Sequence, residues 1–121
     1  MNYNFDNNVP IYIQLVEELK INIISGNYEL GSRIPSVREL AVDKKVNPNT
    51  MQKALCELEN MGLIYTERTN GKYVTTDNEL IESMKVEYAK NLVNSYFDSM
   101  KKIGFSEKDA FKYIKSVEGE K

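Results

Sequence analysis

Two helix starts follow each other closely within residues 32–64, and they constrain the fold more than any other feature of the chain. Ser36 and Glu39 have the spacing of a capping box, in which each side chain satisfies the other residue's free backbone amide. Asn47 and Pro48 suit an N-cap and a first helical position, where proline's missing N–H is not needed. The pattern predicts a short helix, a tight turn and a second helix beginning at Asn47.

The second of these helices is expected to have an apolar side and a polar side. Met51, Leu55 and Leu58 share one side at about 100° per residue. The opposite side carries amides, a lysine and a thiol: Asn49, Gln52, Lys53, Cys56 and Asn60. A short helix, a tight turn and a longer helix with an exposed polar face make a helix-turn-helix, whose second helix can enter the major groove of DNA.

Further elements are predicted on both sides of this pair. Pro10 suits the start of a first helix, and Gly26 its end. The β-rich runs 63–68 and 72–75 surround Thr69-Asn70-Gly71 and predict a hairpin. A long helix of about 25 residues, from about residue 77 to Gly104, and a short one starting at Ser106 should follow.

The expected fold is mainly α. A winged helix-turn-helix of three helices and a β-hairpin wing, residues 1–76, is followed by a two-helix C-terminal dimerisation tail, residues 77–121. The tail repeats apolar residues at helical spacing: Tyr88, Leu92, Tyr96 and Met100. One long and one short helix cannot bury this stripe alone, so it folds onto the winged helix or pairs with a second copy. Pairing is favoured, because two-fold operators need two heads about 34 Å apart. A pocket for a small-molecule effector between the subunits is a further option.

The residue composition excludes several functions. The chain has one cysteine, Cys56, and no histidine, which excludes an internal disulfide, the usual zinc sites and any histidine base. The carboxylates are scattered, so we expect no enzyme, no metal and no cofactor. No signal peptide is apparent and no apolar run approaches the ~20 residues of a membrane span, so a cytoplasmic location without a membrane partner is expected.

Charge alone does not identify a partner. The net charge is −2, so the whole chain has no basic footprint for nucleic acid. Residues 33–72 carry seven basic and five acidic residues, a surplus of two. An interpretation as a nucleic-acid-binding protein therefore rests on the geometry of the helices.

Several motifs together resemble the winged-helix domain of GntR-family transcription regulators. They are Pro-Ile-Tyr-Ile-Gln at 10–14, Gly-Ser-Arg-Ile-Pro-Ser-Val-Arg-Glu-Leu-Ala at 31–41 and Val-Asn-Pro-Asn-Thr at 46–50. The short helical tail and the Asn-Pro-Asn-Thr start resemble the YtrA subfamily. The resemblance implies a homodimer on a pseudo-palindromic operator in double-stranded DNA. It also implies a repressor, often of its own operon with ABC-transporter genes.

The resemblance also implies which residues contact DNA. Arg38 matches the arginine of helix two, Thr50 the phosphate-binding threonine and Gly71 the glycine at the wing tip. Many relatives have arginine where this chain has Pro48, so Asn49 or Gln52 is expected to pair with adenine instead. The complete set of expected DNA-binding residues is Arg38, Asn47, Asn49, Thr50, Gln52, Lys53, Arg68, Gly71 and Lys72.

Simpler interpretations stand beside these. Arg38 could pair locally with acids, and Thr50 could be a cap or a packing residue. Lys44 and Lys45 are weaker phosphate candidates than the lysines of the set, and Cys56 is expected to have no chemistry. The fold could also serve as a protein-interaction module, with the wing and the third helix docking to another protein.

Overall fold

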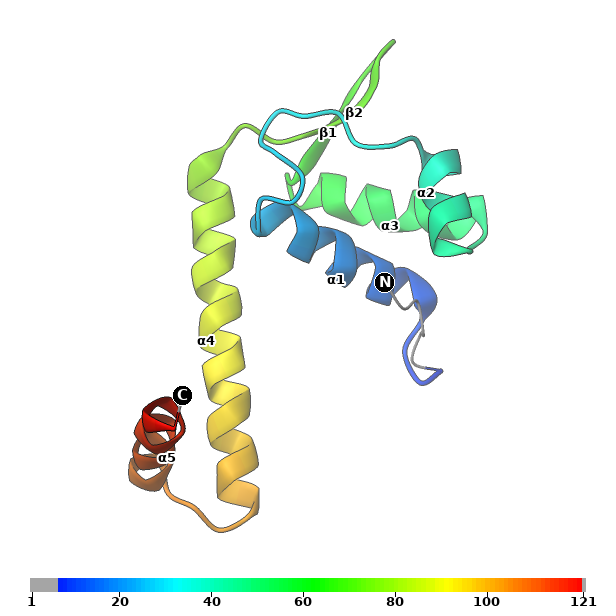
Figure 1. The fold of residues 1–121 in the computed structure, drawn as a ribbon. Helices are drawn as coiled ribbons and strands as arrows, with labels where there is room; N and C mark the ends of the chain where they lie inside the picture. Colours follow the sequence, from blue (N-terminus) through cyan, green and yellow to red (C-terminus); the bar gives the residue numbers. More distant parts are fainter. Residues whose placement is uncertain (1–6, 121) are drawn as a thin grey trace. The chain divides into compact units, whose positions relative to one another are not determined.

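The structure, a computed structural model, describes residues 7–120 and forms five helices and one hairpin (Figure 1). It divides into two compact units, which meet between Ser83 and Met84, inside the fourth helix. The elements in chain order are α1 (Ile11–Ile24), α2 (Val37–Lys44), α3 (Pro48–Asn60), β1 (Ile64–Glu67), β2 (Gly71–Val74), α4 (Asn78–Lys102) and α5 (Glu107–Gly119). The mainly helical fold with a two-stranded antiparallel hairpin confirms the predicted fold class.

The core of the first unit lies where α1, α2, α3 and β1 meet. Its largest fully buried side chains are apolar: Leu15, Leu19, Met51, Leu55, Leu58, Leu63, Ile64 and Val74. Residues spaced three or four apart on α1 and α3 supply most of them, as expected for helices that bury one face. One face of α3 is therefore committed to the core.

Both predicted helix starts are present. The amide of Glu39 donates to Oγ of Ser36 at 3.1 Å, and the amide of Ser36 donates to Oε1 of Glu39 at 3.3 Å. Oδ1 of Asn47 accepts from the amide of Asn49 at 2.8 Å, and proline occupies the first turn of α3. Between the two helices Lys45 is left-handed, with φ 58°. This one residue reverses the chain within the tight turn.

A short segment before α2 pairs with the hairpin. No helix or strand was predicted between Gly26 and Ser36, but Arg33 forms an antiparallel bridge with Tyr73 of β2. The amide of Ile34 donates to the carbonyl of Lys72 at 3.0 Å, and the amide of Val74 donates to the carbonyl of Ser32 at 2.9 Å. These bonds occupy the edge of β2 that β1 leaves free.

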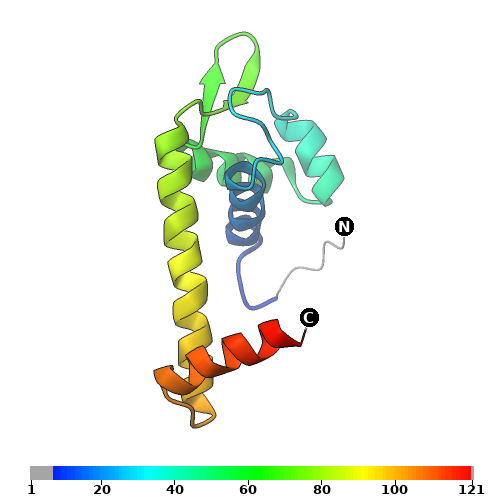
Figure 2. The ribbon, with the colours of Figure 1, turned by 60° about the vertical axis from the view of Figure 1, so that its left-hand side comes forward.

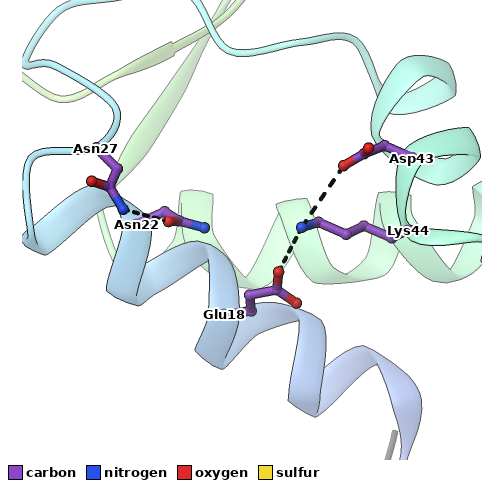
Figure 3. A network of polar contacts seen from close by, with 5 residues as sticks. All are labelled: Glu18, Asn22, Asn27, Asp43 and Lys44. Carbon is purple, nitrogen blue, oxygen red and sulfur yellow. Dashed lines mark hydrogen bonds and ion pairs between the residues drawn. The ribbon is translucent and has the colours of Figure 1, made fainter. Parts of the chain in front are cut away.

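A partly buried ion pair links α1 to α2 (Figure 3). Nζ of Lys44 lies 2.5 Å from Oε1 of Glu18 and 3.8 Å from Oδ2 of Asp43. Lys44 is 4% exposed, so its ammonium is not accessible to a phosphate, and the prediction of Lys44 as a weak phosphate candidate was wrong.

A separate polar contact lies near the end of α1, where Nδ2 of Asn27 donates to Oδ1 of Asn22 at 2.9 Å (Figure 3).

The second unit consists of α4 from Met84 onwards and α5 (Figure 2). Gly104, with φ 98°, lies in the turn between the helices, and Ser106 and Asp109 form a capping box at the predicted start of α5. The hydroxyl of Tyr96 donates to the carbonyl of Ala110 at 2.7 Å, and the rings of Phe97 and Phe111 lie 5.5 Å apart. Between residues 84 and 120, Ala110 is the only buried residue.

None of the helices in residues 7–120 combines the length and the apolar character that crossing a membrane would require.

Candidate nucleic-acid interface

The two faces of α3 lie in different environments. Met51, Ala54, Leu55 and Leu58 are buried in the core. The polar side is exposed, as predicted: Asn49, Gln52, Lys53, Cys56 and Asn60. Because the apolar residues are already covered, the helix can present its polar side to another molecule without opening the core.

The residues at the start of α3 differ in how free their side chains are. Oδ1 of Asn47 is occupied by the helix cap, so this residue mainly sets where α3 begins. Thr50 is half-buried, whereas Asn49 is exposed. Nε2 of Gln52 lies 3.5 Å from Sγ of Cys56, one turn further along the helix. Exposed amides on successive turns are suited to reading base edges, since an amide both donates and accepts hydrogen bonds.

Lys53 points towards α1. Its Nζ lies 3.8 Å from the centre of the Tyr12 ring, an arrangement that attracts the ammonium to the ring face. A hollow of about 400 Å³ beside this pair is also lined by Asn49 and Thr50. Sequence spacing could not link Tyr12 with Lys53, because the contact joins two helices that are distant along the chain.

Arg38 is exposed on α2. Among residues 7–120 no carboxylate forms an ion pair with it, and the neighbouring Glu39 is used by the capping box. The alternative in which Arg38 pairs locally with acids is therefore not the arrangement observed. Its guanidinium remains available to a partner.

The two cations of the wing, Arg68 and Lys72, differ in their exposure and in their contacts. Arg68 is exposed in the loop between β1 and β2. Lys72 is half-buried: its Nζ donates to Oγ1 of Thr66 at 2.8 Å and lies 3.8 Å from Oε1 of Glu59. The Thr66 hydroxyl in turn donates to Glu59 of α3. Lys72 thus links the wing to α3, while Arg68 is the freer cation.

Gly71 begins β2 with φ 103°, a conformation that favours glycine. The guanidinium of Arg33 lies against it: a Cβ added to Gly71 would be 3.1 Å from Nε of Arg33. Arg33 was not among the expected site residues. Arg33 lies in the motif of residues 31–41, but nothing in that motif predicted a contact between Arg33 and the wing.

No group of three or more His, Cys, Asp or Glu side chains is arranged to hold a metal ion in the described part of the chain. The residues brought together here offer amides, hydroxyls and cations. This chemistry suits hydrogen bonds to bases and phosphates.

Comparison with known proteins identifies the family. The model of "Bacterial regulatory proteins, gntR family" matches residues 11–74, from the first turn of α1 to the end of β2. The chain belongs to the GntR family. The matched region contains every one of the expected DNA-binding residues.

Two similar proteins differ in how much of the chain they match and in how similar they are to it. The HTH-type transcriptional regulator YhcF of Bacillus subtilis (strain 168) is 28% identical over 116 residues, 96% of each chain. The HTH-type transcriptional repressor YtrA of the same organism is 44% identical over 66 residues, 54% of this chain and 51% of YtrA. The likeness to YtrA is thus higher but spans only about half of either protein.

A solved structure of a GntR-family transcriptional regulator from Listeria monocytogenes is 40% identical, with a TM-score of 0.85 over 93% of this chain and 98% of that one. The DNA-binding domain of AraR, solved in complex with operator ORX1, is 31% identical, with a TM-score of 0.53 over 55% of this chain and 81% of that one. With the family model, these similarities establish a DNA-binding transcription regulator. The relatives are regulators and not enzymes.

Proposed function

We propose that this regulator is a cytoplasmic homodimeric repressor of the YtrA subfamily that recognises a pseudo-palindromic operator. The observation that carries the proposal is the division of α3 into a buried apolar face and an exposed polar face. A helix whose core contacts are complete can enter the major groove with its first turns. We assign residues 1–76 to DNA binding and residues 77–121 to dimerisation.

We assign the residues of α3 and α2 different roles. Asn49 and Gln52, exposed on successive turns of α3, pair with base edges, with adenine as the expected partner of an amide. Thr50 and Lys53 contact the phosphate backbone: both line the hollow beside Tyr12, where the hydroxyl and the ammonium can donate to phosphate oxygens. Arg38 contacts a base or a phosphate with its unpaired guanidinium.

In the wing we assign backbone contacts to Arg68, to the main chain at Gly71 and to Lys72. Lys72 has an ammonium with three donors, of which one is used by Thr66. Asn47 acts as the cap that positions these residues.

Dimerisation through the second unit is supported by its poor burial. A unit of fewer than about 40 residues rarely buries enough apolar surface to be stable by itself, and this one has a single buried residue among those described. Its candidate interface residues comprise exposed Leu92 and half-buried Tyr88, Tyr96 and Met100. A second copy of the chain supplies the missing apolar partner and the second head for a two-fold operator.

The second unit also offers space for the effector considered above. A hollow of about 710 Å³ is lined mainly by apolar and aromatic side chains, including Tyr96, Met100, Phe105 and Ile114. In the proposed dimer the second copy covers this surface. An effector bound there would therefore alter the pairing of the two copies, which is how we expect any ligand response to arise.

The central test is an electrophoretic mobility shift with the DNA upstream of the protein's own gene, supported by footprinting. We expect a complex containing two copies, whose affinity falls steeply with salt because phosphate contacts release counterions. Arg38→Ala should abolish specific binding while leaving the folded state intact. Absence of a shift at low salt, together with salt-insensitive capture of a protein partner, would favour the interaction module instead.

A regulatory test addresses repression. Deleting the gene should raise transcription from its own upstream region, and from any ABC-transporter genes in the same operon. A fall in transcription on deletion would identify an activator and leave DNA binding unaffected.

A further inference from the structure

The chain has three arginines, Arg33, Arg38 and Arg68, and all lie in the winged-helix unit. All three are exposed, and no ion pair with a carboxylate occupies any of them within residues 7–120. Arg33 and Arg68 line the same hollow of about 290 Å³, between the wing and the segment that leads into α2. Neither guanidinium forms an ion pair with a carboxylate among the described residues, so both can donate to an anion that enters the hollow.

The position of Arg33 is fixed by the backbone. Its two neighbours, Ser32 and Ile34, are each hydrogen-bonded to β2, at 2.9 and 3.0 Å. Its guanidinium lies along the wing, so that a Cβ on Gly71 would approach Nε to 3.1 Å and Nη2 to 3.2 Å. A glycine at the start of β2 therefore leaves the room that the Arg33 side chain occupies.

The charges around the hollow leave a positive surplus. Lys72 also lines it, but its ammonium lies 3.8 Å from Glu59, which offsets its charge. Glu67 is the only carboxylate of the lining, which also contains two arginines. The hydroxyl-bearing Thr69 adds a neutral donor. Guanidinium forks with a hydroxyl beside them match the oxygens of a phosphate diester, whose geometry favours paired N–H donors.

We propose that Arg33 is a further DNA-contacting residue, which together with Arg68 binds one phosphate of the duplex backbone beside the wing. This inference rests on the proposed function, since it takes operator DNA as the ligand. A backbone phosphate fits better than a base edge because the guanidinium of Arg33 lies against Gly71 of the wing and not on the exposed face of α3. Arg33 would then contribute to affinity and register, and not to the choice of base.

The test compares the salt dependence of DNA binding by the full-length protein and by Arg33→Gln. Each copy of the proposed dimer loses one of the two cations at its phosphate, so the slope of log K against log salt should fall by up to about 1.8, which is about 0.9 for each copy. Binding to operator and to non-operator duplex of equal length should weaken by the same factor. Lys90→Gln, which removes a charge from the exposed surface of α4, is the matched control and should leave the slope unchanged. An unchanged slope in Arg33→Gln would overturn the inference.

Two further variants separate binding from folding. Arg33→Lys keeps the charge but loses the fork, so it should retain the slope and lose part of the affinity. The double change Arg33→Gln with Arg68→Gln should weaken binding by less than the product of the single effects, since both act on one phosphate. If the two substitutions weaken binding independently, the two arginines do not share a phosphate. If Arg33→Gln lowers the melting temperature, the residue stabilises the wing instead. If the unaltered protein binds no DNA, the proposed function itself fails, which is a different result.

Discussion

Two helices of this chain have the same length and a similar pattern but different surroundings. α3 and α5 each contain 13 residues, begin with a side-chain cap and carry an apolar and a polar side. On α3 the apolar side is fully covered, with Leu55 at 0% exposure. On α5, Phe111, Ile114 and Val117 remain 57%, 46% and 55% exposed.

The difference lies in what each helix has to pack against. α3 contacts α1, α2 and β1, and together these elements enclose a core within one chain. α5 has only the second part of α4 in its own unit. An amphipathic pattern thus specifies which side of a helix seeks cover but not whether the cover comes from the same chain. In α3 the free side is polar and faces the proposed DNA; in α5 it is apolar and faces the proposed second copy.

The largest expected effect follows from the complete core around α3. Leu55→Ala should lower the free energy of unfolding by about 2–5 kcal/mol, because it removes a fully buried side chain and leaves a cavity. Denaturant unfolding of the first unit, monitored at several protein concentrations, measures this loss. The loss should be independent of concentration, and a concentration-dependent loss would mean that α3 also depends on a second copy.

A substitution on the apolar side of α5 should weaken dimerisation and not the folding of one chain. Ile114→Lys places a charge on the exposed apolar side and should weaken dimerisation by about 1.5–3 kcal/mol for each copy, the value of burying one isoleucine. Sedimentation equilibrium measures the change in dimer dissociation.

Ser116→Lys is the matched control for that experiment, since it adds the same charge on the other side of α5. It should leave the dimer unchanged. Equal weakening of the dimer by the two variants would show that charge, and not the apolar face, governs association. The apolar side of α5 would then not be covered by a second copy.

Local features of the helices could be predicted from the sequence. The starts of α2, α3 and α5 and the length of α4 were predicted correctly, because capping residues and glycines act on the few residues beside them. Ser36 and Glu39 form the predicted capping box, and a second box, of Ser106 and Asp109, lies at the predicted start of α5. The exposed polar side of α3 followed from helical spacing alone.

Contacts between elements could not be predicted in the same way. The burial of Lys44 depends on Glu18 of another helix, and the pairing of Arg33 with Tyr73 depends on the free edge of β2. The contact between Lys53 and Tyr12 likewise requires α1 and α3 to be placed together first. Each joins residues far apart in sequence, and no local spacing encodes such a pair.

A smaller effect should follow from changing the polar side of α3. Gln52→Ala should reduce discrimination at one base pair by about 1–3 kcal/mol, the value of a bidentate pair, without changing stability, because the side chain is exposed. Competition between operator variants altered at single positions measures it. A uniform loss on all sequences would assign Gln52 to the backbone instead.

Cys56 offers an independent probe of the same face. It is exposed one turn from Gln52, at 3.5 Å between Nε2 and Sγ. Operator DNA should slow its reaction with a maleimide, and salt that dissociates the complex should restore the rate. Unchanged reactivity in a saturated complex would mean that this part of α3 lies outside the interface.

The smallest effect concerns the caps of the two helices. α3 is capped by the neutral amide of Asn47, whereas the box of α5 uses the carboxylate of Asp109. The backbone amide of Ser106 chiefly, then its hydroxyl and the charge of Lys112, hold the pKa of Asp109 below its ordinary value of 3.8. A lowered pKa in the folded state means that the contribution of this carboxylate is present above about pH 3.8 and is lost as the pH falls through the folded value.

Acidification should therefore loosen the start of α5 before it affects the start of α3. The carboxyl carbon shift of Asp109, followed by NMR against pH, should titrate below 3.8, and Ser106→Ala should move the pKa of Asp109 upwards. The amides of the first turn of α5 should lose protection over the same range, while those capped by Asn47 have no such titration. Titration of Asp109 at or above 3.8 in the unaltered protein would remove this difference. The two helices would then be distinguished by their packing alone.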